Sequence, residues 1–536
     1  MFIYSSKMLK PLLTIGFVFS SGLSRIRDAF LFMKMLAKDA AKLREKAATL
    51  NDELRAALES DSGGEAFDPG RKTIFLVVTC GQAVRTILVS GLLGKLRERY
   101  NIVIFSPYYR SEHFLNSYKA ENVRVLPWFD NYTLRLEFLA AYYHMHCSSS
   151  GTLKSIMENI EVNAKQGSSK KIRNAARRQY KMLNFSVLVG KLFGRKTLSG
   201  VHQIFLWAVL PHGMFRMLFD RFSPELVLST AAHHSASWPL THYAQDQGVV
   251  TAAYVISWDN LTTKTLLDEH VDHYLVWSDE MLTEMQEHFP FIEAQAHVVG
   301  SPQFDMYFNK EGLVPRDEFV QSMGLNPDLP YILYATNTPI AMPEEPQIIK
   351  EYWEAIQKTD LAGKVSLVVR LHPKDMISRY EELGELPDIA ITLAGPPEWE
   401  GADKWLPDQE IMAYMLNQMA HASVSINVAS TMSLEGFCLG LPTLNVAYTT
   451  ATNKKRENLL WSFEMYHSSD HYKALVDEGA VLVAHSKEEL INATKESLKH
   501  GATRKEAMQK VLSQKVSYCD GSSSERFSQV IGEIIS

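Results

Sequence analysis

A histidine flanked by cations follows one of the predicted buried strands. Val365–Leu371 is an apolar run rich in β-branched residues, and Arg370, His372 and Lys374 lie at its carboxyl end. Protonated histidine, arginine and lysine donate charge-assisted hydrogen bonds to phosphate oxygens. Pro373 ends the hydrogen bonding of the strand. The group predicts a phosphate-binding position, and a capped strand end with a surface histidine is the alternative.

Hydroxyl groups open a predicted helix after a second buried strand. Residues 422–427 form that strand, and Ser430, Thr431 and Ser433 follow it. The N-terminus of a helix carries unpaired N–H groups and a partial positive charge, so anions bind there. Ordinary N-capping is the alternative. Glu435 lies about one turn into this otherwise apolar helix, where a carboxylate needs a partner such as a sugar hydroxyl.

Three side chains in the first half of the chain are candidate general bases. One lies in the loop after the predicted strand 251–256, and two follow the strand 225–229. Each could take a proton from an attacking hydroxyl group, although the first is also a candidate helix cap. The candidates are Asp259, His233 and His234, and the sequence leaves the choice among them open.

The loop after the first predicted strand, 73–78, should reach the same sheet edge as these bases. The carboxyl ends of parallel strands form the ligand-binding edge of an open α/β sheet. We therefore expect this loop and the loop around position 259 to line a cleft for an acceptor or a diphosphate. The predicted cleft residues are Gly81, Gln82, Arg85, Trp258 and Asn260.

The elements that must position these groups form two α/β units. Apolar strands alternate with helical patterns over 73–310, the first predicted domain, and again over 311–486, the second, before helices at 487–536. Strands separated by helices indicate βαβ units and mostly parallel sheets. The predicted fold class is α/β, with two Rossmann-like parallel-sheet domains that face a cleft.

The N-terminal segment, 1–58, is predicted to be helical or coiled-coil, and a linker follows at 59–72. Apolar residues recur every seven positions over 26–58, a pattern typical of a coiled-coil seam. The pattern fits two interpretations equally: the helix forms a homodimer, or it lies on its own domain. Residues 11–23 are apolar but too few to span a bilayer, which takes about 20 residues. They predict either packing on the body or a shallow membrane anchor.

A helical insertion over about 132–220 contains a purely basic block. No Asp or Glu lies between Asn163 and Phe219, whereas ten Lys or Arg residues lie in 165–196. A strongly apolar stretch follows. Because cations attract anionic headgroups and apolar helices enter the interface, 165–219 predicts contact with an anionic membrane surface. A solvated basic face beside a core helix is the alternative.

The composition excludes several classes of protein. The 536 residues carry a formal charge of −6, which argues against a nucleic-acid partner. Four cysteines without a CxxC pair exclude a disulfide scaffold and a cysteine zinc site and fit a reducing cytoplasm. Phosphate-loop and dinucleotide motifs and D-x-D aspartates are missing from the sequence. We expect a cytoplasmic protein, peripheral to the inner face of the membrane if the basic block binds it, with no metal and no cofactor.

These motifs together resemble a known family. Two α/β units with His372-Pro373, followed by S-T-x-x-x-E-G-x-x-x-G-x-P at 430–442, resemble glycosyltransferases of the GT-B fold. The resemblance is closer to the branch with CDP-glycerol glycerophosphotransferases, bacterial sialyl- and Kdo-transferases and non-hydrolysing UDP-GlcNAc 2-epimerases. Val299–Asp305 resembles the stretch that closes the first GT-B domain. The resemblance covers roughly residues 72 to 447.

The resemblance implies roles for residues of both units. In those families the HP histidine contacts the donor phosphate, the Ser/Thr pair binds the phosphates, and the helix glutamate holds the ribose. The corresponding residues here are His372, Ser430, Thr431 and Glu435. The loop at 258–260 resembles in position a W-H-G-T loop whose histidine is the proposed base of glycerophosphotransferases. Asp259 replaces that histidine, which favours an inverting sugar transferase.

The sequence therefore predicts a metal-independent, inverting glycosyltransferase. It would move a sugar from a nucleotide-sugar donor on the second domain to a cell-surface glycan or lipid-linked acceptor on the first. The alternatives are a CDP-glycerol-type glycerophosphotransferase, a nucleotide-sugar 2-epimerase, and a non-enzymatic scaffold for envelope assembly.

Overall fold

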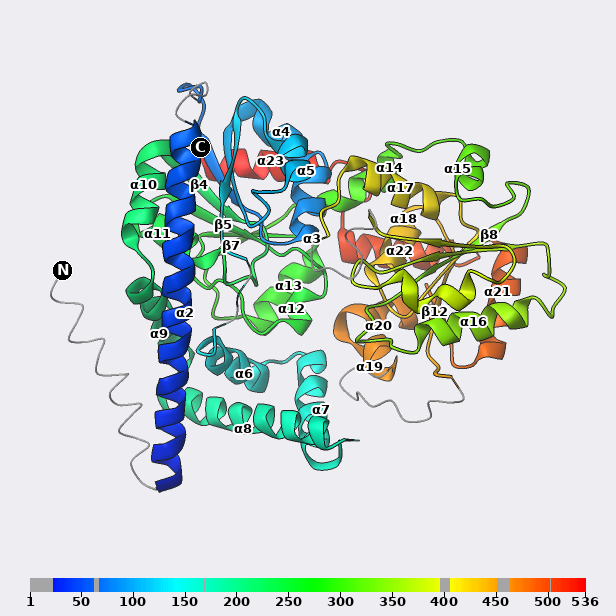
Figure 1. Cartoon of the computed structure of the whole chain (residues 1–536), viewed down its shortest axis with the longest axis horizontal. Helices are drawn as coiled ribbons and strands as arrows, with labels where there is room; N and C mark the ends of the chain where they lie inside the picture. Colours follow the sequence, from blue (N-terminus) through cyan, green and yellow to red (C-terminus); the bar gives the residue numbers. More distant parts are fainter. Residues whose placement is uncertain are drawn as a thin grey trace.

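The computed structural model describes residues 23–61, 67–130, 132, 134–167, 169–395, 405–450, 463–501 and 503–536. Two bodies, each built around one parallel sheet, lie side by side (Figure 1). Of the apolar segment 11–23, all but the last residue lies outside the described residues, so the two interpretations of that segment stay predictions.

The first sheet has seven parallel strands in the order β3-β2-β1-β4-β5-β6-β7. The chain order reverses between β1 and β4, and ligands of open α/β sheets bind beyond the strand ends at such a point. The strands are β1 (Thr73–Val77), β2 (Asn101–Ser106), β3 (Val123–Pro127), β4 (Pro224–Ser229), β5 (Val250–Tyr254), β6 (His273–Val276) and β7 (Gln295–Val298).

The second sheet has six parallel strands in the order β10-β9-β8-β11-β12-β13, and its order reverses between β8 and β11. The strands are β8 (Tyr331–Ala335), β9 (Ser366–Arg370), β10 (Ile389–Thr392), β11 (Val424–Asn427), β12 (Thr443–Val446) and β13 (Leu482–Ala484). The predicted fold class, α/β with two parallel-sheet domains, is confirmed. Only β13 was not predicted, because its three residues are too few to give an apolar run between two helices.

Helices cover both faces of each sheet, which is why the strands are apolar throughout rather than alternating. Those that follow strands of the first sheet are α3 (Gly81–Ala83), the π-helix η2 (Val84–Val89), α4 (Leu92–Arg99), α5 (Glu112–Tyr118), α11 (Trp238–Asp246), α12 (Asn260–Thr263), α13 (Asp279–His288), the 3-10 turn η3 (Pro302–Phe304) and α14 (Asp305–Asn309).

The second domain and the chain end contribute α15 (Arg316–Ser322), α16 (Glu345–Ile356), the 3-10 turns η4 (Ile377–Arg379) and η5 (Glu381–Leu383), α17 (Gln409–Ala420), α18 (Thr431–Cys438), α19 (Phe463–Ser468), α20 (Asp470–Asp477), α21 (Lys487–His500), α22 (Lys505–Val516) and α23 (Ser523–Ile534). Between β3 and β4 the chain forms α6 (Glu137–Cys147), α7 (Gly151–Gln166), α8 (Lys170–Phe193), α9 (Arg195–Val209) and α10 (His212–Phe222).

The long helix α2 (Leu23–Asp61) packs on the first domain. This favours the interpretation that the helix lies on its own domain over the interpretation that it forms a homodimer. Leu43, Ala47, Leu50 and Leu54, from the predicted seam, are buried in one cluster with Phe75 of β1. Over the C-terminal half of α2, the apolar seam is therefore covered by the first domain of the same chain and not by a second copy of the protein. The helix also continues to position 61, into the predicted linker. Within the described part of the chain, no helix is long and apolar enough to cross a membrane.

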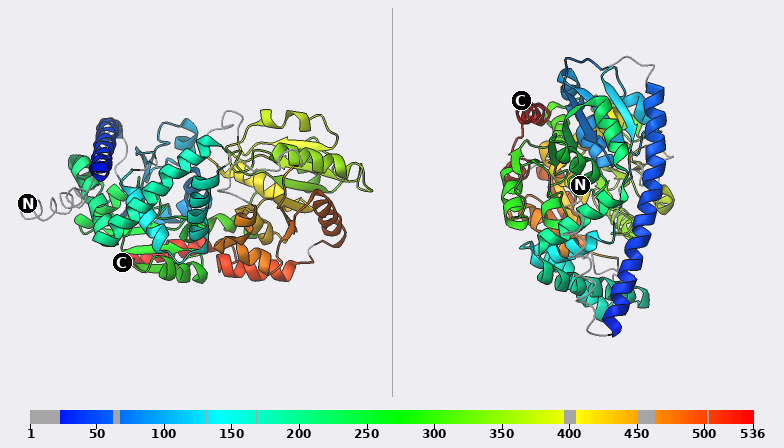
Figure 2. Two further views of the ribbon diagram at one scale, coloured as in Figure 1. Left: turned by 90° about the horizontal axis from the view of Figure 1, so that it is seen from below. Right: turned by 90° about the vertical axis from the view of Figure 1, so that its left-hand side faces the viewer.

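The chain crosses between the two sheets twice, and the two crossings touch. The first leaves the first domain after α14, and the second returns before α23, which packs on the first sheet through Phe527 against Tyr254. Asn309 Nδ2 donates to the Gly521 carbonyl at 3.0 Å. A Cβ atom on Gly521 would lie 2.2 Å from Asn309 Oδ1. We call this contact the hinge. Figure 2 shows α2 and α23 on opposite faces of the first sheet.

Candidate functional site

The ends of β9, β8 and β11 meet at the carboxyl edge of the second sheet. His372 follows β9, and its backbone N–H donates to Thr336 Oγ1 at 2.8 Å. The Thr336 N–H donates to the Arg370 carbonyl at 3.0 Å. The Lys374 N–H donates to His372 Nδ1 at 3.1 Å, so a neutral ring keeps its proton on Nε2. These bonds fix the predicted histidine at the edge, beside a threonine that was not predicted.

Ser430 begins α18 as its N-cap, and the Met432 N–H donates to its hydroxyl at 3.3 Å. Ser433 differs from the prediction. Its hydroxyl is fully buried, lies 2.8 Å from the Tyr472 hydroxyl, and bonds to the Asn427 side chain. Because the helix turns this side chain away from the N-terminus and toward α20, Ser433 does not reach the predicted anion position.

Arg370 also differs from the prediction. The residue is 5% exposed, and its Nη1 donates to Gln418 Oε1 of α17 at 2.6 Å. Side chains alternate between the two faces of a strand, and this one lies under a helix instead of extending beyond the strand end. Of the three residues predicted to bind a phosphate here, only His372 and Lys374 therefore lie in the loop beyond the end of the strand.

Glu435 pairs with a residue of the other domain. Arg85 Nη2 lies 2.7 Å from Glu435 Oε1, with side-chain exposures of 10% and 1%, and it also donates to the Tyr307 hydroxyl at 3.2 Å. The second carboxylate oxygen of Glu435 has no hydrogen-bond partner among the described residues. The carboxylate predicted to hold a ribose is thus engaged by the arginine predicted to face the cleft. We call this pair the latch.

The loops after β1, β4 and β5 meet at the carboxyl edge of the first sheet. His234 Nδ1 lies 2.8 Å from Thr79 Oγ1, and Gln82 Nε2 donates to the Ile256 carbonyl at 3.4 Å. Burial, with a smaller effect of Lys264, lowers the pKa of His234 to about 4. His234 is therefore neutral near pH 7, and its Nδ1 is already bonded.

Two further contacts cross the cleft. A Cβ atom on Gly81 would lie 2.0 Å from the Trp405 carbonyl oxygen, so only glycine allows the second domain to approach this loop so closely. Trp258 Nε1 donates to Thr431 Oγ1 at 3.1 Å. The loop that holds Asp259 and the N-terminus of α18 are therefore in direct contact.

Asp259 is surrounded by donors. Ser257 Oγ and Thr263 Oγ1 donate to its carboxylate, the latter at 3.0 Å, and Asn260 Nδ2 lies 3.3 Å away. Burial acts to raise the pKa of Asp259, but Lys264, His471 and the donating hydroxyls lower it below its ordinary value. A carboxylate stabilised in this way is a weak base. Asn260, predicted to face the cleft, is 3% exposed and orients Asp259 instead.

His233 differs from Asp259 in having a side-chain nitrogen that is not already hydrogen-bonded. Its Nδ1 is buried and has no hydrogen-bond partner among the described residues. Burial lowers the pKa of His233 well below its ordinary value, and neighbouring His234 and Lys264 add to this, whereas Asp259 opposes it. The imidazole is therefore neutral near pH 7, and its Nδ1 is available to accept a proton, but its lowered pKa makes it a weak base, as it does Asp259.

Helix α20 brings two side chains that were not predicted. The indole of Trp258 lies with its centroid 5.2 Å from that of His471 and 5.8 Å from that of Tyr472. His471 Nδ1 lies 3.3 Å from Thr262 Oγ1. These residues follow no predicted strand, so the strand-end rule could not find them. Thr336 follows β8 directly, and the same rule would have identified it.

No family model matches the sequence, and the search of curated proteins gave no match. Solved structures do match. A protein of Listeria monocytogenes assigned as a UDP-N-acetylglucosamine 2-epimerase has a TM-score of 0.50 and 11% identity, over 87% of this chain and 96% of that one. The UDP-GlcNAc 2-epimerase of Methanocaldococcus jannaschii has a TM-score of 0.48 and 12% identity, over 86% and 99%.

WaaG, a glycosyltransferase involved in lipopolysaccharide biosynthesis, has a TM-score of 0.42 and 10% identity, over 86% of this chain and 99% of that one. The chain has the GT-B fold. The predicted resemblance is confirmed at the level of the fold. The two GT-B domains touch through the latch, the Gly81 loop and the Trp258 indole, so loops at the carboxyl edges of the two sheets are in contact.

Proposed function

We propose that the chain is a glycosyltransferase that uses a nucleotide-sugar donor. The observation that carries the proposal is the hydrogen bond of 3.1 Å from Trp258 to Thr431. It brings the proton-accepting edge of one domain against the N-terminus of α18 in the other. A helix N-terminus binds anions, so a sugar phosphate bound there lies beside the candidate bases.

The proposed reaction is a single displacement. The acceptor hydroxyl attacks the anomeric carbon, the bond from that carbon to the phosphate oxygen breaks, and the nucleotide leaves with the bonding electrons. His233 takes the hydroxyl proton. His372, Lys374 and the N–H groups at the start of α18 stabilise the charge that develops on the leaving phosphate. Attack from the opposite face inverts the anomeric centre.

A second candidate is a nucleotide-sugar 2-epimerase. It is favoured by one observation, the TM-score of 0.50 with the L. monocytogenes protein, which is assigned as such an enzyme. An epimerase converts its nucleotide sugar without an acceptor, whereas a transferase releases nucleotide only by transfer or slow hydrolysis. Incubation with UDP-GlcNAc alone, followed by NMR of the product, separates the two: a 2-epimer supports the epimerase.

The first test is a thermal-shift screen of CMP, CDP, UDP and GDP. A ligand that binds only the folded chain stabilises it by about 2.7 kcal/mol at 100 times Kd. We expect one nucleotide to raise the melting temperature of the wild type, and His372→Ala and Thr431→Ala to reduce that shift. Thr283→Ala, at an exposed position on α13, is the matched control. The proposal fails if no nucleotide gives a shift, or if both site variants respond like the wild type.

We further propose that the acceptor lies at an anionic membrane surface. Helix α8 has 24 residues and no acidic residue. Its exposed side chains recur at helical spacing and are mostly cationic, and Leu188 and Leu192 on the same helix are 44% and 53% exposed. Trp207 of the next helix is 60% exposed. The exposed cations are Lys170, Lys171, Arg177, Arg178, Lys181 and Lys191.

Co-sedimentation with vesicles tests this surface. We expect binding to phosphatidylglycerol vesicles and not to phosphatidylcholine vesicles. Each cation near the surface contributes about 1 kcal/mol, so the triple variant Arg177→Gln/Arg178→Gln/Lys181→Gln should bind about 10²-fold more weakly. The control, Lys358→Gln/Lys364→Gln/Lys499→Gln, changes three exposed cations of the second domain. Equal loss in both triple variants would show that only net charge matters.

A further inference from the structure

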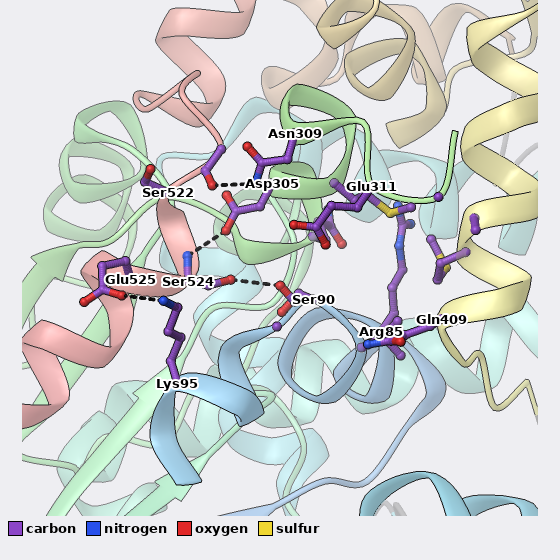
Figure 3. Close-up of a pocket in the computed structure, with 18 residues that line it drawn as sticks. Arg85, Ser90, Lys95, Asp305, Asn309, Glu311, Gln409, Ser522, Ser524 and Glu525 are labelled. Atoms are coloured by element: carbon purple, nitrogen blue, oxygen red, sulfur yellow. Dashed lines mark hydrogen bonds and ion pairs between the residues drawn. The ribbon is translucent and has the colours of Figure 1, made fainter. Parts of the chain in front are cut away.

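A cavity of about 570 Å³ lies between the hinge and the latch. Its wall comes from four parts of the chain: η2 with α4, the segment from η3 to position 312, the start of α17, and the turn before α23. Its volume lies within the range of small-molecule sites. Of the residues predicted for the cleft, only Arg85 lines it. Figure 3 shows Asp305 and Glu525 on one side of this space and Arg85 and Gln409 on the other.

The charged groups of the wall do not suit a phosphate. Three carboxylates and two cations line it, and both cations are already paired: Arg85 in the latch, and Lys95 with Glu525 at 3.0 Å. Asp305 is also engaged, because it accepts from the Ser523 and Ser524 N–H groups at 2.9 and 2.8 Å. Among the described lining residues, carboxylates therefore outnumber cations, and both cations already contact a carboxylate, which disfavours an anionic ligand.

The groups that remain suit hydroxyls. Gln303 is 2% exposed; its Oε1 accepts from Thr86 at 3.2 Å, and its Nε2 has no partner among the described residues. The structure shows no hydrogen bond or ion pair for the Glu311 carboxylate within the described part of the chain. Since a hydroxyl both donates and accepts, a polyol satisfies the two groups together. Apolar patches from Met306 and Met412 suit the C–H faces of a sugar ring.

We propose that this cavity binds a saccharide, neutral or carrying an amino group, and that its occupancy controls the angle between the two domains. The ligand would contact Asn309 and Gly521 of the hinge on one side and Arg85 of the latch on the other. A ligand that binds one angle better than another shifts the population toward it. The binding step is independent of the proposed function, whereas an effect on sugar transfer rests on it.

Isothermal titration calorimetry without nucleotide tests the binding step, with glucose, N-acetylglucosamine, glucosamine and maltose as probes. We expect one probe to bind at millimolar concentration. Glu311→Ala removes an acceptor at an exposed position and Ala413→Leu fills the wall, and each should weaken binding about tenfold, the effect of one lost hydrogen bond to a charged group or of a steric block. Glu410→Ala, exposed on α17 but outside the wall, is the control. Glucosamine against glucose separates an amine ligand from a hydroxyl ligand.

Hydrogen exchange at α18 tests the effect on the domain angle. We expect the bound saccharide to change exchange of the α18 amides in the wild type and not in Glu311→Ala. Binding that both cavity variants leave unchanged, or no binding of any probe, overturns the proposal. Saccharide binding without any nucleotide response would support the cavity proposal while the proposed function fails. A nucleotide response without saccharide binding would support the proposed function while the cavity proposal fails.

Discussion

The two sheet edges that face the cleft differ in chemistry. The edge of the first sheet carries ionisable groups: His233 and His234, whose pKa values burial lowers, and Asp259, whose pKa Lys264, His471 and the donating hydroxyls lower against the effect of burial. The edge of the second carries hydroxyls, the N-terminus of α18 and His372. Ionisable side chains transfer protons, and the N–H groups at a helix N-terminus favour anion binding. The difference indicates that neither domain can carry out the proposed reaction alone.

The largest expected effect is on the first edge. His233→Gln removes the proposed base and should lower kcat by about 10² to 10⁴ while the KM for the donor stays constant. Nucleotide release from the donor found by the thermal screen is the measurement, and exposed His500→Gln is the control. A normal rate in His233→Gln together with a loss in Asp259→Asn would move the base role to Asp259.

The pH profile sharpens the same assignment. A base must be deprotonated to act, and burial lowers the pKa of His233 well below its ordinary value. We therefore expect kcat/KM of the wild type to stay constant as the pH falls from 8 through 6.5. An acid limb centred at pH 6.5 or higher would contradict a buried histidine as the base.

The latch tests whether the two edges are held together by a buried pair. Arg85→Met leaves Glu435 buried without its partner and should reduce the free energy of unfolding by about 3 to 5 kcal/mol. Adding Glu435→Leu should recover most of that loss, measured by denaturant unfolding. The exposed pair of Lys95 with Glu525 is the control, because Lys95→Met should cost less than about 1 kcal/mol. Equal losses would show that the latch contributes no more than a surface pair.

One carboxyl group near the edge of the second sheet also has a pKa displaced by burial. Glu345 is fully buried and accepts from the Asn337 N–H at 2.7 Å, just beyond β8. Burial raises the pKa of Glu345 to about 8. The folded chain therefore keeps this proton over the pH range from about 4.5 to 8 while the unfolded chain loses it. Stability should fall as the pH rises through that range, by at most about 1.4 kcal/mol per pH unit from this group.

Unfolding in urea at a series of pH values measures this dependence. Glu345→Gln removes the titrating proton and should flatten the decline between pH 4.5 and 8, with Glu351→Gln on the same helix as the control. A decline that is the same in wild type and Glu345→Gln would show that other groups cause it.

The smallest expected effect is on the contact that carries the functional proposal. Trp258→Phe removes one hydrogen bond to Thr431 and should cost about 1 kcal/mol of stability. The nucleotide should still raise the melting temperature, because the helix N-terminus remains. Complete loss of the nucleotide response would mean that the indole, and not the helix end, binds the nucleotide.

The sequence was sufficient for the sheets and for the loops at their ends. Apolar, β-branched runs identified the strands, and the rule that ligands bind beyond parallel strand ends selected His372, Thr431 and Trp258. The rule gives position along the chain but not side-chain direction. Arg370 and Ser433 satisfied it and yet lie under α17 and against α20.

Pairings across the cleft could not be predicted. Arg85 and Glu435 were each selected for a ligand, and nothing in their spacing shows that they bind each other over 350 positions. His471 was missed for the same reason, since it reaches Trp258 from a helix that follows no site strand. The position of α2 on its own domain was also beyond the seven-residue pattern, because that pattern fits any apolar surface.

The last helix has a consequence for biosynthesis. Phe527 and Ile531 of α23 complete the apolar cluster on one face of the first sheet, together with Ile74 and Leu76 of β1. A ribosome adds about 5 to 20 residues per second. This face of the first sheet therefore stays without α23 for on the order of ten seconds or more while the second domain is made. The first domain can therefore acquire its final packing only after the second domain has been made, and the nascent chain needs protection from aggregation until then.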